Sequence, residues 1–584
     1  KGMHMMFEVN DLAVASPATV SRCGMVYMEA VYIGNRPLWQ SWCESHALPS
    51  NYPENAASLL ELLDGYVDGA LAFVRDGAKE GLATVEANLI GSCLRLLSAS
   101  LTEANGVSAS VDMVTLVKNV GLHFVFAFVW AFGGNLRESS REKFDAYVRG
   151  CGLLDRLNVQ LPKAGSVFDY CVDINSGGFV NWGSLTAPFA FDKDVPYFNI
   201  LVPTGETTCY SHLLKKLVAD GSHVMLVGET GTGKSVLVQD YLANQLPETA
   251  SAIAASFSAQ TSARNMQDLL ESKLDKLRKN LLGAPPGRTS VVFVDDLNMP
   301  ALEVYGAQPP IELLRQWMDH GGWYDLKECA FRELVDLQFV AAMGPPGGGR
   351  NPVTPRYLRH YNVCWLTDHG PASLERIFGT ILKWHLEPFS AEVKSLTKDI
   401  VLCTTRIYQA ISVEMLPTPA KSHYTFNLRD MSKVFQGVLQ STPKSVTSAN
   451  ELLRLWCHEC MRVFADRLVN ADDKGWFWTL LCKQLRETFA KEWDVVTGTS
   501  EDRLIYGDFM RDDTTDYLPI EKIEPLIERM TTQLDDYNAV SVRCPPARPP
   551  ARAAPAHRHT PTLSLQKVDR TPCRTFPTPP PPPP

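Results

Sequence analysis

Residues 228–235 combine the residue types that bind a polyphosphate. They read Gly-Glu-Thr-Gly-Thr-Gly-Lys-Ser and follow directly on the apolar run 224–227, which predicts a short buried strand before the loop. Glycines let the backbone curl so that successive N–H groups face an anion, and the helix expected after the loop points its N-terminus at the same anion. Lys234 can reach the β- and γ-phosphates of a nucleotide, and the Ser235 hydroxyl can hold Mg²⁺. We therefore predict a nucleotide site formed by Gly228, Glu229, Thr230, Gly231, Thr232, Gly233, Lys234 and Ser235.

A second apolar run ends in two acidic residues. Residues 290–294 read Ser-Val-Val-Phe-Val and are followed by Asp295 and Asp296. A buried strand of this kind presents a carboxylate at the carboxyl edge of a parallel sheet, where Asp295 would bind Mg²⁺ directly or through water. Asp296 stands where many ATPases carry the Glu that orients the attacking water. The alternative is a strand that ends in a solvated turn, and the phosphate loop upstream favours the metal site.

Arginines follow a third apolar run, residues 337–343. A glycine-rich loop begins at Gly344, and beyond it Arg356 and Arg359 are expected on one face of a short helix. One of these two could reach a phosphate across a subunit boundary. Arg429 stands at another expected helix start.

The order of expected elements indicates how these residues are positioned. Apolar strands alternate with helices around the phosphate loop, which predicts an α/β fold with a parallel sheet flanked by helices. Helical spacing of apolar residues occurs on both sides of this region. The Pro-, Ala-, Arg- and Thr-rich end of the chain cannot bury a core, and we expect it to be disordered or polyproline II. The expected divisions are 1–30 with a strand ending at Asn10, a helical part 31–155, a linking segment 156–200, the α/β part 201–390, a second helical part 391–541, and the tail 542–584.

Composition narrows the function classes. The net charge is −9, and the segment 543–584 holds seven Lys and Arg against one Asp, so the rest of the chain is clearly acidic. An acidic body argues against nucleic acid as a partner. The most apolar segment, 123–132, is about half of the ~20 residues that a membrane span needs, which predicts a buried core helix and no membrane association. The 14 cysteines lack framework spacing, as in reduced cytosolic proteins.

Longer motifs resemble one family. Residues 293–300 (Phe-Val-Asp-Asp-Leu-Asn-Met-Pro), 338–350 (Gln-Phe-Val-Ala-Ala-Met-Gly-Pro-Pro-Gly-Gly-Gly-Arg) and 423–430 (His-Tyr-Thr-Phe-Asn-Leu-Arg-Asp) resemble the third AAA+ module of a dynein heavy chain of the axonemal type. Residues 10–25 resemble the end of the second module's α/β part, which makes 31–155 the helical lid of that module. The resemblance covers about residues 1–541.

The resemblance implies a microtubule motor. In this family six AAA+ modules form a ring in one chain, and ATP hydrolysis mainly in the first drives movement along microtubules. The implied cofactors are ATP or ADP with Mg²⁺. The implied partners are the other AAA+ modules, dynein intermediate and light chains, and microtubules, which are contacted through a stalk that this sequence lacks. The implied location is the cytoplasm and cytoskeleton, in the axoneme of a cilium or flagellum.

The resemblance also implies roles for three arginines. Arg429 matches the lid arginine that senses the γ-phosphate. Arg359 matches the arginine finger that contacts the nucleotide bound by the second module. Arg22 matches the arginine finger that contacts the nucleotide bound by the first module.

Three departures from the family pattern matter, and the first two bear on turnover. Asp296 replaces the Glu of the strongest hydrolytic modules, and Gly344 stands where a polar sensor residue, usually Asn, touches the γ-phosphate or water. The site is therefore expected either to hydrolyse ATP slowly and regulate the ring, or to bind nucleotide as a structural module without turnover. The family pattern stops near Val542, and we expect the tail to come from a truncated or mis-spliced gene model rather than from a designed ending.

Overall fold

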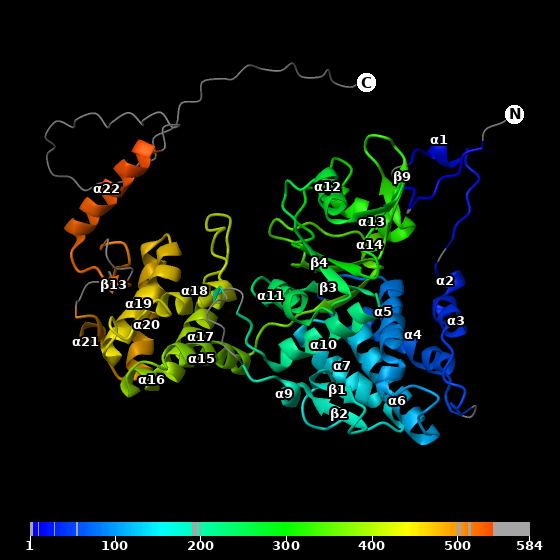
Figure 1. Ribbon diagram of the computed structural model, residues 1–584, viewed down its shortest axis with the longest axis horizontal. Helices are drawn as coiled ribbons and strands as arrows, with labels where there is room; N and C mark the ends of the chain where they lie inside the picture. The colour runs from blue at the N-terminus through cyan, green and yellow to red at the C-terminus, as the bar shows by residue number, and fades with distance from the viewer. Residues whose placement is uncertain are drawn as a thin grey trace, which may run out of the picture. The chain divides into compact units, whose positions relative to one another are not determined.

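The computed structural model describes residues 4–9, 11–13, 15–28, 30–53, 56–189, 196–197, 200–498, 504–511 and 516–540 (Figure 1). The chain divides into two compact units, Lys1–Ile520 and Glu521–Pro584. The second unit contains one described helix, α22 (Ile523–Val540). The predicted tail beyond it, 542–584, lies outside the described residues.

The first described residues correct one expectation. Residues 4–9 form no strand, and Met6 and Phe7 are 98% and 77% exposed. A strand needs a neighbour to accept its backbone hydrogen bonds, and none of the described strands pairs with this segment. Asn10, where the strand was expected to end, lies outside the described residues. Two short helices follow, α1 (Pro17–Val20) and α2 (Ala30–Ile33).

A helical region occupies residues 36–157, close to the predicted 31–155. Polar side chains cap the start of two long helices. The Ser58 side chain accepts a hydrogen bond from the backbone N–H of Glu61 (3.2 Å), and the Asp112 carboxylate accepts one from the backbone N–H of Thr115 (3.0 Å). The elements are α3 (Arg36–Ser45), α4 (Leu59–Gly77), α5 (Glu86–Ser100), η1 (Glu103–Asn105), α6 (Met113–Gly133), α7 (Glu138–Gly150) and α8 (Leu153–Arg156).

Helix α6 is the core of this region. It is apolar on all sides, and every residue from Asn119 to Gly133 is buried. Its length and mean hydropathy would suffice to cross a membrane, but 72% of its most apolar window is buried inside the protein. This confirms the prediction of a buried core helix at 123–132, although the helix is 21 residues long, about twice the apolar run.

The segment expected to be a linker contains structure of its own. After η2 (Val167–Asp169), the strands β1 (Tyr170–Asp173) and β2 (Gly178–Asn181) form an antiparallel hairpin, followed by α9 (Trp182–Leu185). Trp182 is 3% exposed, and its indole N–H donates to the Phe168 carbonyl (2.9 Å). Phe168 in turn packs edge-on against Trp130 of α6 (ring centroids 5.5 Å apart), and Cys171 of β1 belongs to the same core, so this segment packs onto the helical region.

A five-stranded parallel sheet forms the centre of the α/β part and confirms that prediction. Its order is β11-β3-β10-β7-β4. Nearly all residues of its three middle strands are buried, as expected where helices cover both faces. The strands are β3 (His223–Val227), β4 (Ala250–Ser256), β7 (Thr289–Asp295), β10 (Leu337–Met343) and β11 (Tyr361–Trp365).

Helix α10 (Gly205–Ala219) leads into β3, and four α-helices and a π-helical turn lie between the described strands of the sheet. The latter are α11 (Lys234–Asp240) continued by the π-helical η4 (Tyr241–Gln245), α12 (Ala263–Lys273), α13 (Pro309–His320) and α14 (Pro355–Leu358). A second, four-stranded sheet of order β5-β6-β9-β8 was not predicted. Its strands are β5 (Asp275–Arg278), β6 (Leu281–Gly283), β8 (Gly322–Tyr324) and β9 (Phe331–Val335).

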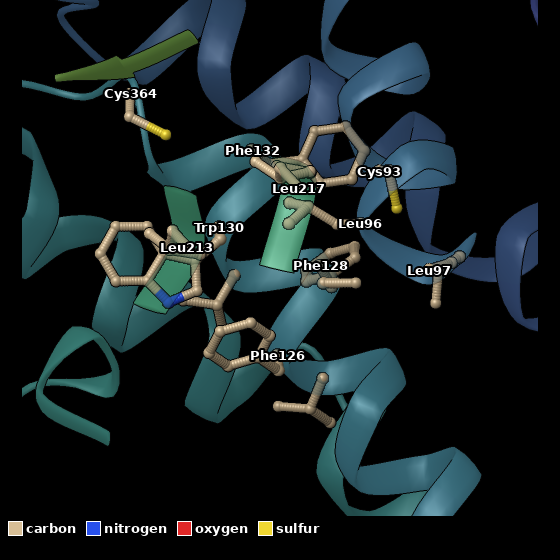
Figure 2. Close-up of a cluster of buried hydrophobic side chains, with 14 of the residues drawn as sticks. Cys93, Leu96, Leu97, Phe126, Phe128, Trp130, Phe132, Leu213, Leu217 and Cys364 are labelled. Atoms are coloured by element: carbon tan, nitrogen blue, oxygen red, sulfur yellow. The ribbon is translucent and has the colours of Figure 1, made fainter. Parts of the chain in front are cut away.

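One hydrophobic core joins the first helical region to the sheet. Figure 2 shows Phe128, Phe132, Leu217 and Leu96 close together, and Cys364, at the upper left of the view, belongs to the same buried cluster. These side chains come from α6, α10, α5 and β11. The shared core buries residues from segments more than 200 positions apart, which ties the helical region to the edge of the sheet.

Polar contacts reinforce this junction. The Asn88 amide donates to the carbonyls of Leu358 (2.6 Å) and Tyr361 (3.0 Å), and Arg95 donates to the same Tyr361 carbonyl (3.0 Å). These hydrogen bonds satisfy backbone carbonyls at the end of α14 (Leu358) and at the start of β11 (Tyr361).

A second helical region follows the sheet and has its own core. Its longer helices are amphipathic, and α18 and α19 begin at capping boxes made by Asn427 with Asp430 and by Ser448 with Glu451. The elements are α15 (Pro371–His385), α16 (Ala391–Ser395), α17 (Thr397–Glu414), α18 (Leu428–Val438), α19 (Ala449–Val463), η5 (Ala465–Arg467), α20 (Ala471–Phe489), α21 (Trp493–Thr497), β12 (Tyr506–Gly507) and β13 (Leu518–Pro519).

Candidate functional site

The loop 228–233 leaves the end of β3 and leads into α11, as predicted. Gly231 and Gly233 have φ angles of 97° and 82°, which L side chains rarely adopt. The Thr232 hydroxyl donates to the Glu229 carbonyl (3.0 Å) and closes the turn. The loop therefore has the curled backbone that exposes N–H groups to an anion.

Lys234 begins α11 and folds back over the loop. Its ammonium donates to the carbonyls of Gly228 (2.9 Å) and Glu229 (2.7 Å) and to the Thr232 hydroxyl (3.2 Å). Burial, together with the nearby charge of Arg350, lowers the pKa of Lys234 to about 8. A partly buried cation that is held only by neutral groups is well placed to bind an anion.

The metal-binding residues predicted from sequence meet in the structure. The Ser235 hydroxyl donates to Asp295 Oδ1 (2.9 Å), although 60 residues separate them in the chain. Burial raises the pKa of the Asp295 carboxyl, the hydrogen bond from Ser235 opposes this, and the charge of Asp296 raises it again. A hydroxyl and a carboxylate side by side are oxygen ligands of the kind that Mg²⁺ prefers.

Asp296 has an unusual backbone. Its φ angle is +51°, in the left-handed region, and its N–H donates to Asp295 Oδ1 (3.0 Å). Asp and Asn tolerate this region better than other residues that have a Cβ. The position of the expected water-orienting carboxylate is therefore set by a tight turn at the end of β7.

Gly344 follows β10, and an arginine fills the space beside it. A Cβ added to Gly344 would lie 2.6 Å from the guanidinium carbon of Arg350. Arg350 Nη2 donates to the Thr230 hydroxyl of the phosphate loop (2.9 Å). Sequence reasoning did not select Arg350. The available signal was an arginine directly after three glycines, at the end of a strand next to the loop strand.

Arg429 comes to the same loop from the second helical region. A Cβ on Gly231 would lie 3.1 Å from Leu428 Cβ and 3.4 Å from the Arg429 backbone nitrogen. The charge of Arg429 is among those that lower the pKa of Lys234. The start of α18 therefore lies beside the phosphate loop.

A small cleft lies behind the loop. It is bounded by the segment after β11 and by the start of α10. Apolar and aromatic side chains mix there with hydroxyl and imidazole groups, and the free volume of about 10 Å³ holds no more than a water-sized group. Its lining residues are Glu206, Thr207, Tyr210, Thr232, Gly233, Leu237, Leu366, Thr367 and His369.

The structure does not bring the other two predicted arginines to this loop. Arg359, just after α14, forms an ion pair with Asp319 at the end of α13 (2.6 Å), and its side chain is 53% exposed. Arg22 lies in an exposed turn after α1, where its backbone N–H donates to the Thr19 carbonyl (3.2 Å). Both were expected to act on the nucleotides of other modules, and these roles stay predictions.

The fold and the site together define a class. A phosphate loop on a strand inside a parallel β11-β3-β10-β7-β4 sheet, an acidic pair on β7, and a helical region that returns an arginine to the loop form a P-loop AAA+ module with its lid. Family models match the same parts. The P-loop containing dynein motor region matches residues 189–369, the dynein heavy chain AAA lid domain matches 59–184, and the AAA+ lid domain matches 400–499.

Curated relatives point to one family. The chain is 41% identical over 577 residues to dynein axonemal heavy chain 1 of Mus musculus, which covers 93% of this chain and 14% of that protein. It is 39% identical over 542 residues to dynein axonemal heavy chain 6 of Homo sapiens (92% of this chain, 13% of that protein). It is 35% identical over 567 residues to the dynein-1-beta heavy chain of the flagellar inner arm I1 complex of Chlamydomonas reinhardtii (91% and 12%).

The chain belongs to the dynein heavy chain family, and it spans about one seventh of the length of the curated relatives it matches. The family resemblance found in the sequence is confirmed. The match of the dynein lid domain to 59–184 also includes the β1-β2 hairpin, which the sequence reading had assigned to a linker.

Proposed function

We propose that the loop 228–235 binds ATP or ADP with Mg²⁺ and that this module regulates a dynein motor. The observation that carries the proposal is the meeting of Lys234, the Ser235–Asp295 pair and Arg429 at one loop. These groups come from three separate parts of the chain, and each suits a different part of a metal-bound nucleotide.

The residues present fit the cofactor. Gly228 to Gly233 would hold the phosphates through backbone N–H groups, Lys234 would neutralise them, and Ser235 and Asp295 would hold Mg²⁺. When bound, Mg²⁺ neutralises charge on the β- and γ-phosphate oxygens. The base would lie against Tyr210 and Leu366 behind the loop, where the cleft would have to widen to admit it.

Turnover at this site is proposed to be slow. Asp296 would orient the attacking water, but its carboxylate is one methylene shorter than that of a Glu, and its backbone is held at a φ angle of +51°. A misplacement of about 1 Å can cost about 100-fold in rate. The second candidate is a module that binds nucleotide without hydrolysis, and the absence of a Cβ at Gly344 favours it because no polar sensor side chain starts there.

For the whole protein we propose ATP-driven movement along microtubules in the axoneme of a cilium or flagellum. Its partners would be the other AAA+ modules, dynein intermediate and light chains, and microtubules. The relatives named above are axonemal and flagellar dynein heavy chains, which supports this location. Arg359 and Arg22 would serve the nucleotides of the preceding modules. The proposed divisions are 1–30 and 31–155 for the second module, 156–200 as connection, 201–390 and 391–541 for the third, and 542–584 as tail.

Nucleotide titration of the 584-residue chain tests the site. Lys234→Ala should weaken ATP affinity by at least about 100-fold, because it removes a charge-assisted contact to the phosphates. Lys215→Ala is the matched control, since this lysine of α10 is exposed and does not line the cleft behind the loop. Unchanged ATP affinity in Lys234→Ala, with circular dichroism like that of the wild type, would contradict the assignment.

A further inference from the structure

We propose that Arg350 is a phosphate-binding residue of this site, which contacts the terminal phosphate of a bound nucleoside triphosphate from the place that a side chain at Gly344 would otherwise fill. The proposal rests on the nucleotide site proposed above and adds a specific function to it. Arg350 would let the site distinguish a triphosphate from a diphosphate.

Sheet register places this arginine between the two halves of the site. Strand β10 lies between β3, which carries the phosphate loop, and β7, which carries the acidic pair. Met343 is paired with Val227, so Gly344 is level with the first residue of the loop. The end of β10 therefore faces the region between Lys234 and Asp295.

The loop after β10 is shaped to return a long side chain to that point. Gly347, Gly348 and Gly349 have φ angles of 122°, 58° and 88°, and Gly347 and Arg350 exchange two backbone hydrogen bonds (3.0 and 3.1 Å). This tight turn sends Arg350 back over Gly344, where its guanidinium carbon lies 2.6 Å from the position of a Cβ. Any side chain at 344 would displace it.

Hydrogen bonds also hold the loop after β10 to the segment that follows β7. The Asn298 amide donates to the Gly344 carbonyl (2.8 Å), and the Asn351 N–H donates to the Asn298 carbonyl (3.0 Å). Asn298 is fully buried. These contacts fix both ends of the loop, so the position of Arg350 is built in and does not depend on a flexible surface segment.

Charge points to an anion as the ligand. Lys234, Arg350 and Arg429 surround the loop, and within the described part of the chain no ion pair joins any of them to a carboxylate within 4.0 Å. The Arg350 guanidinium is held by a neutral hydroxyl, that of Thr230, and is half-buried. A planar guanidinium with free N–H donors matches two oxygens of one phosphate.

Calorimetric titration with a non-hydrolysable ATP analogue and with ADP, each with Mg²⁺, tests the proposal on the full chain. Arg350→Ala should weaken binding of the analogue by about 10- to 100-fold and change ADP affinity by less than about threefold, since only the triphosphate reaches Arg350. Arg350→Lys should retain part of the discrimination. Arg288→Ala, an exposed arginine in the turn before β7, is the matched control and should leave both affinities unchanged.

A double-mutant cycle of Arg350→Ala and Gly344→Ala distinguishes the loss of a phosphate contact from a general disturbance of the fold. Gly344→Ala should mimic Arg350→Ala, because the new Cβ displaces only the end of a flexible side chain and the φ of Gly344 suits any residue. In the Arg350→Ala background, Gly344→Ala should have no further effect.

Three results would overturn the assignment. They are equal weakening of both nucleotides in Arg350→Ala, unchanged binding of both, and additive effects in the cycle. In each case the nucleotide site would still stand if wild-type protein binds and Lys234→Ala does not. Failure of folded wild-type protein to bind either nucleotide would instead refute the proposed function itself.

Discussion

The replacement Asp296→Glu tests whether the length of one side chain limits hydrolysis at this site. One added methylene moves the carboxylate outward by about 1.5 Å, and a misplacement of about 1 Å costs roughly 100-fold in rate. If the short side chain is the limit, single-turnover cleavage of bound ATP should accelerate by up to about 100-fold. Affinity for ATP should stay nearly unchanged, since Asp296 contacts neither the loop nor Ser235 in the described structure.

The same replacement carries a structural cost. The backbone of Asp296 has a φ angle of +51°, which Asp tolerates better than Glu. The penalty should be of the order of 1 kcal/mol, which lowers the melting temperature of a domain of this size by about 2–4 °C. A faster but slightly less stable enzyme is therefore expected.

Rapid-quench mixing of excess protein with radiolabelled ATP measures the cleavage step directly. Asp296→Asn is the control, because it keeps the size of the side chain and removes its charge, and it should abolish the remaining turnover. The reasoning would be refuted by an unchanged rate in Asp296→Glu, or by an Asp296→Asn variant that cleaves as fast as wild type. The first result would favour the module that binds without hydrolysis.

Two further predictions concern stability. Gly81→Ala should lower the free energy of unfolding by about 1–3 kcal/mol in urea titrations, because its Cβ would lie 2.0 Å from the ring of the buried Trp365 on β11. The control Gly65→Ala, in α4 with nothing within 4 Å, should instead add about 0.5–1 kcal/mol, and equal effects of the two would contradict this packing. Burial, helped by the charge of Lys216, lowers the pKa of His123 to about 4, below the value of 6.5 expected when unfolded. Below pH 6.5 His123 is protonated in the unfolded chain but stays neutral in the folded chain. The free energy of unfolding should therefore fall by up to about 3 kcal/mol as the pH drops to 4. Replacing His123 by Asn should reduce this decline between pH 7 and 5, and an identical decline in the variant would contradict the assignment.

Much of the α/β part follows from local sequence. The apolar runs that end at Val227, Asp295 and Met343 form three neighbouring strands, and their spacing alone predicted a shared carboxyl edge. The hydrogen bond between Ser235 and Asp295 is the direct consequence of that edge. Residue type and order were sufficient because parallel strands leave little choice of where such groups meet.

Other elements depend on contacts that no local pattern encodes. Strand β5 (Asp275–Arg278) reads Asp-Lys-Leu-Arg, has no apolar alternation, and exists only because β6 pairs with it. The segment at 4–9 is apolar but lacks a described partner strand, so it stays without regular structure. Strand formation in both cases is decided by neighbours rather than by composition.

Side-chain placement was the least predictable feature of the site. Spacing left Arg356 and Arg359 as alternatives, and the family resemblance assigned Arg359 to the nucleotide of a neighbouring module. Arg359 forms an ion pair with Asp319, 40 residues earlier in the chain, and its role stays a prediction. Arg350 was overlooked because three consecutive glycines with positive φ decide where it points. The sequence contains the arginine, but no local pattern predicts the turn that places its side chain beside the phosphate loop.

The continuous core between α6 and β11 has a mechanical consequence. Close-packed interiors transmit displacement instead of absorbing it, so the first helical region and the sheet should turn as one block. Leu366 still belongs to this core, and its N–H donates to the Val227 carbonyl (2.7 Å). The stretch 367–370 before α15 has no regular structure and would serve as the pivot for the second helical region. If α18 closes onto a bound nucleotide, the second helical region would then rotate as a rigid body relative to the block formed by the sheet and the first helical region.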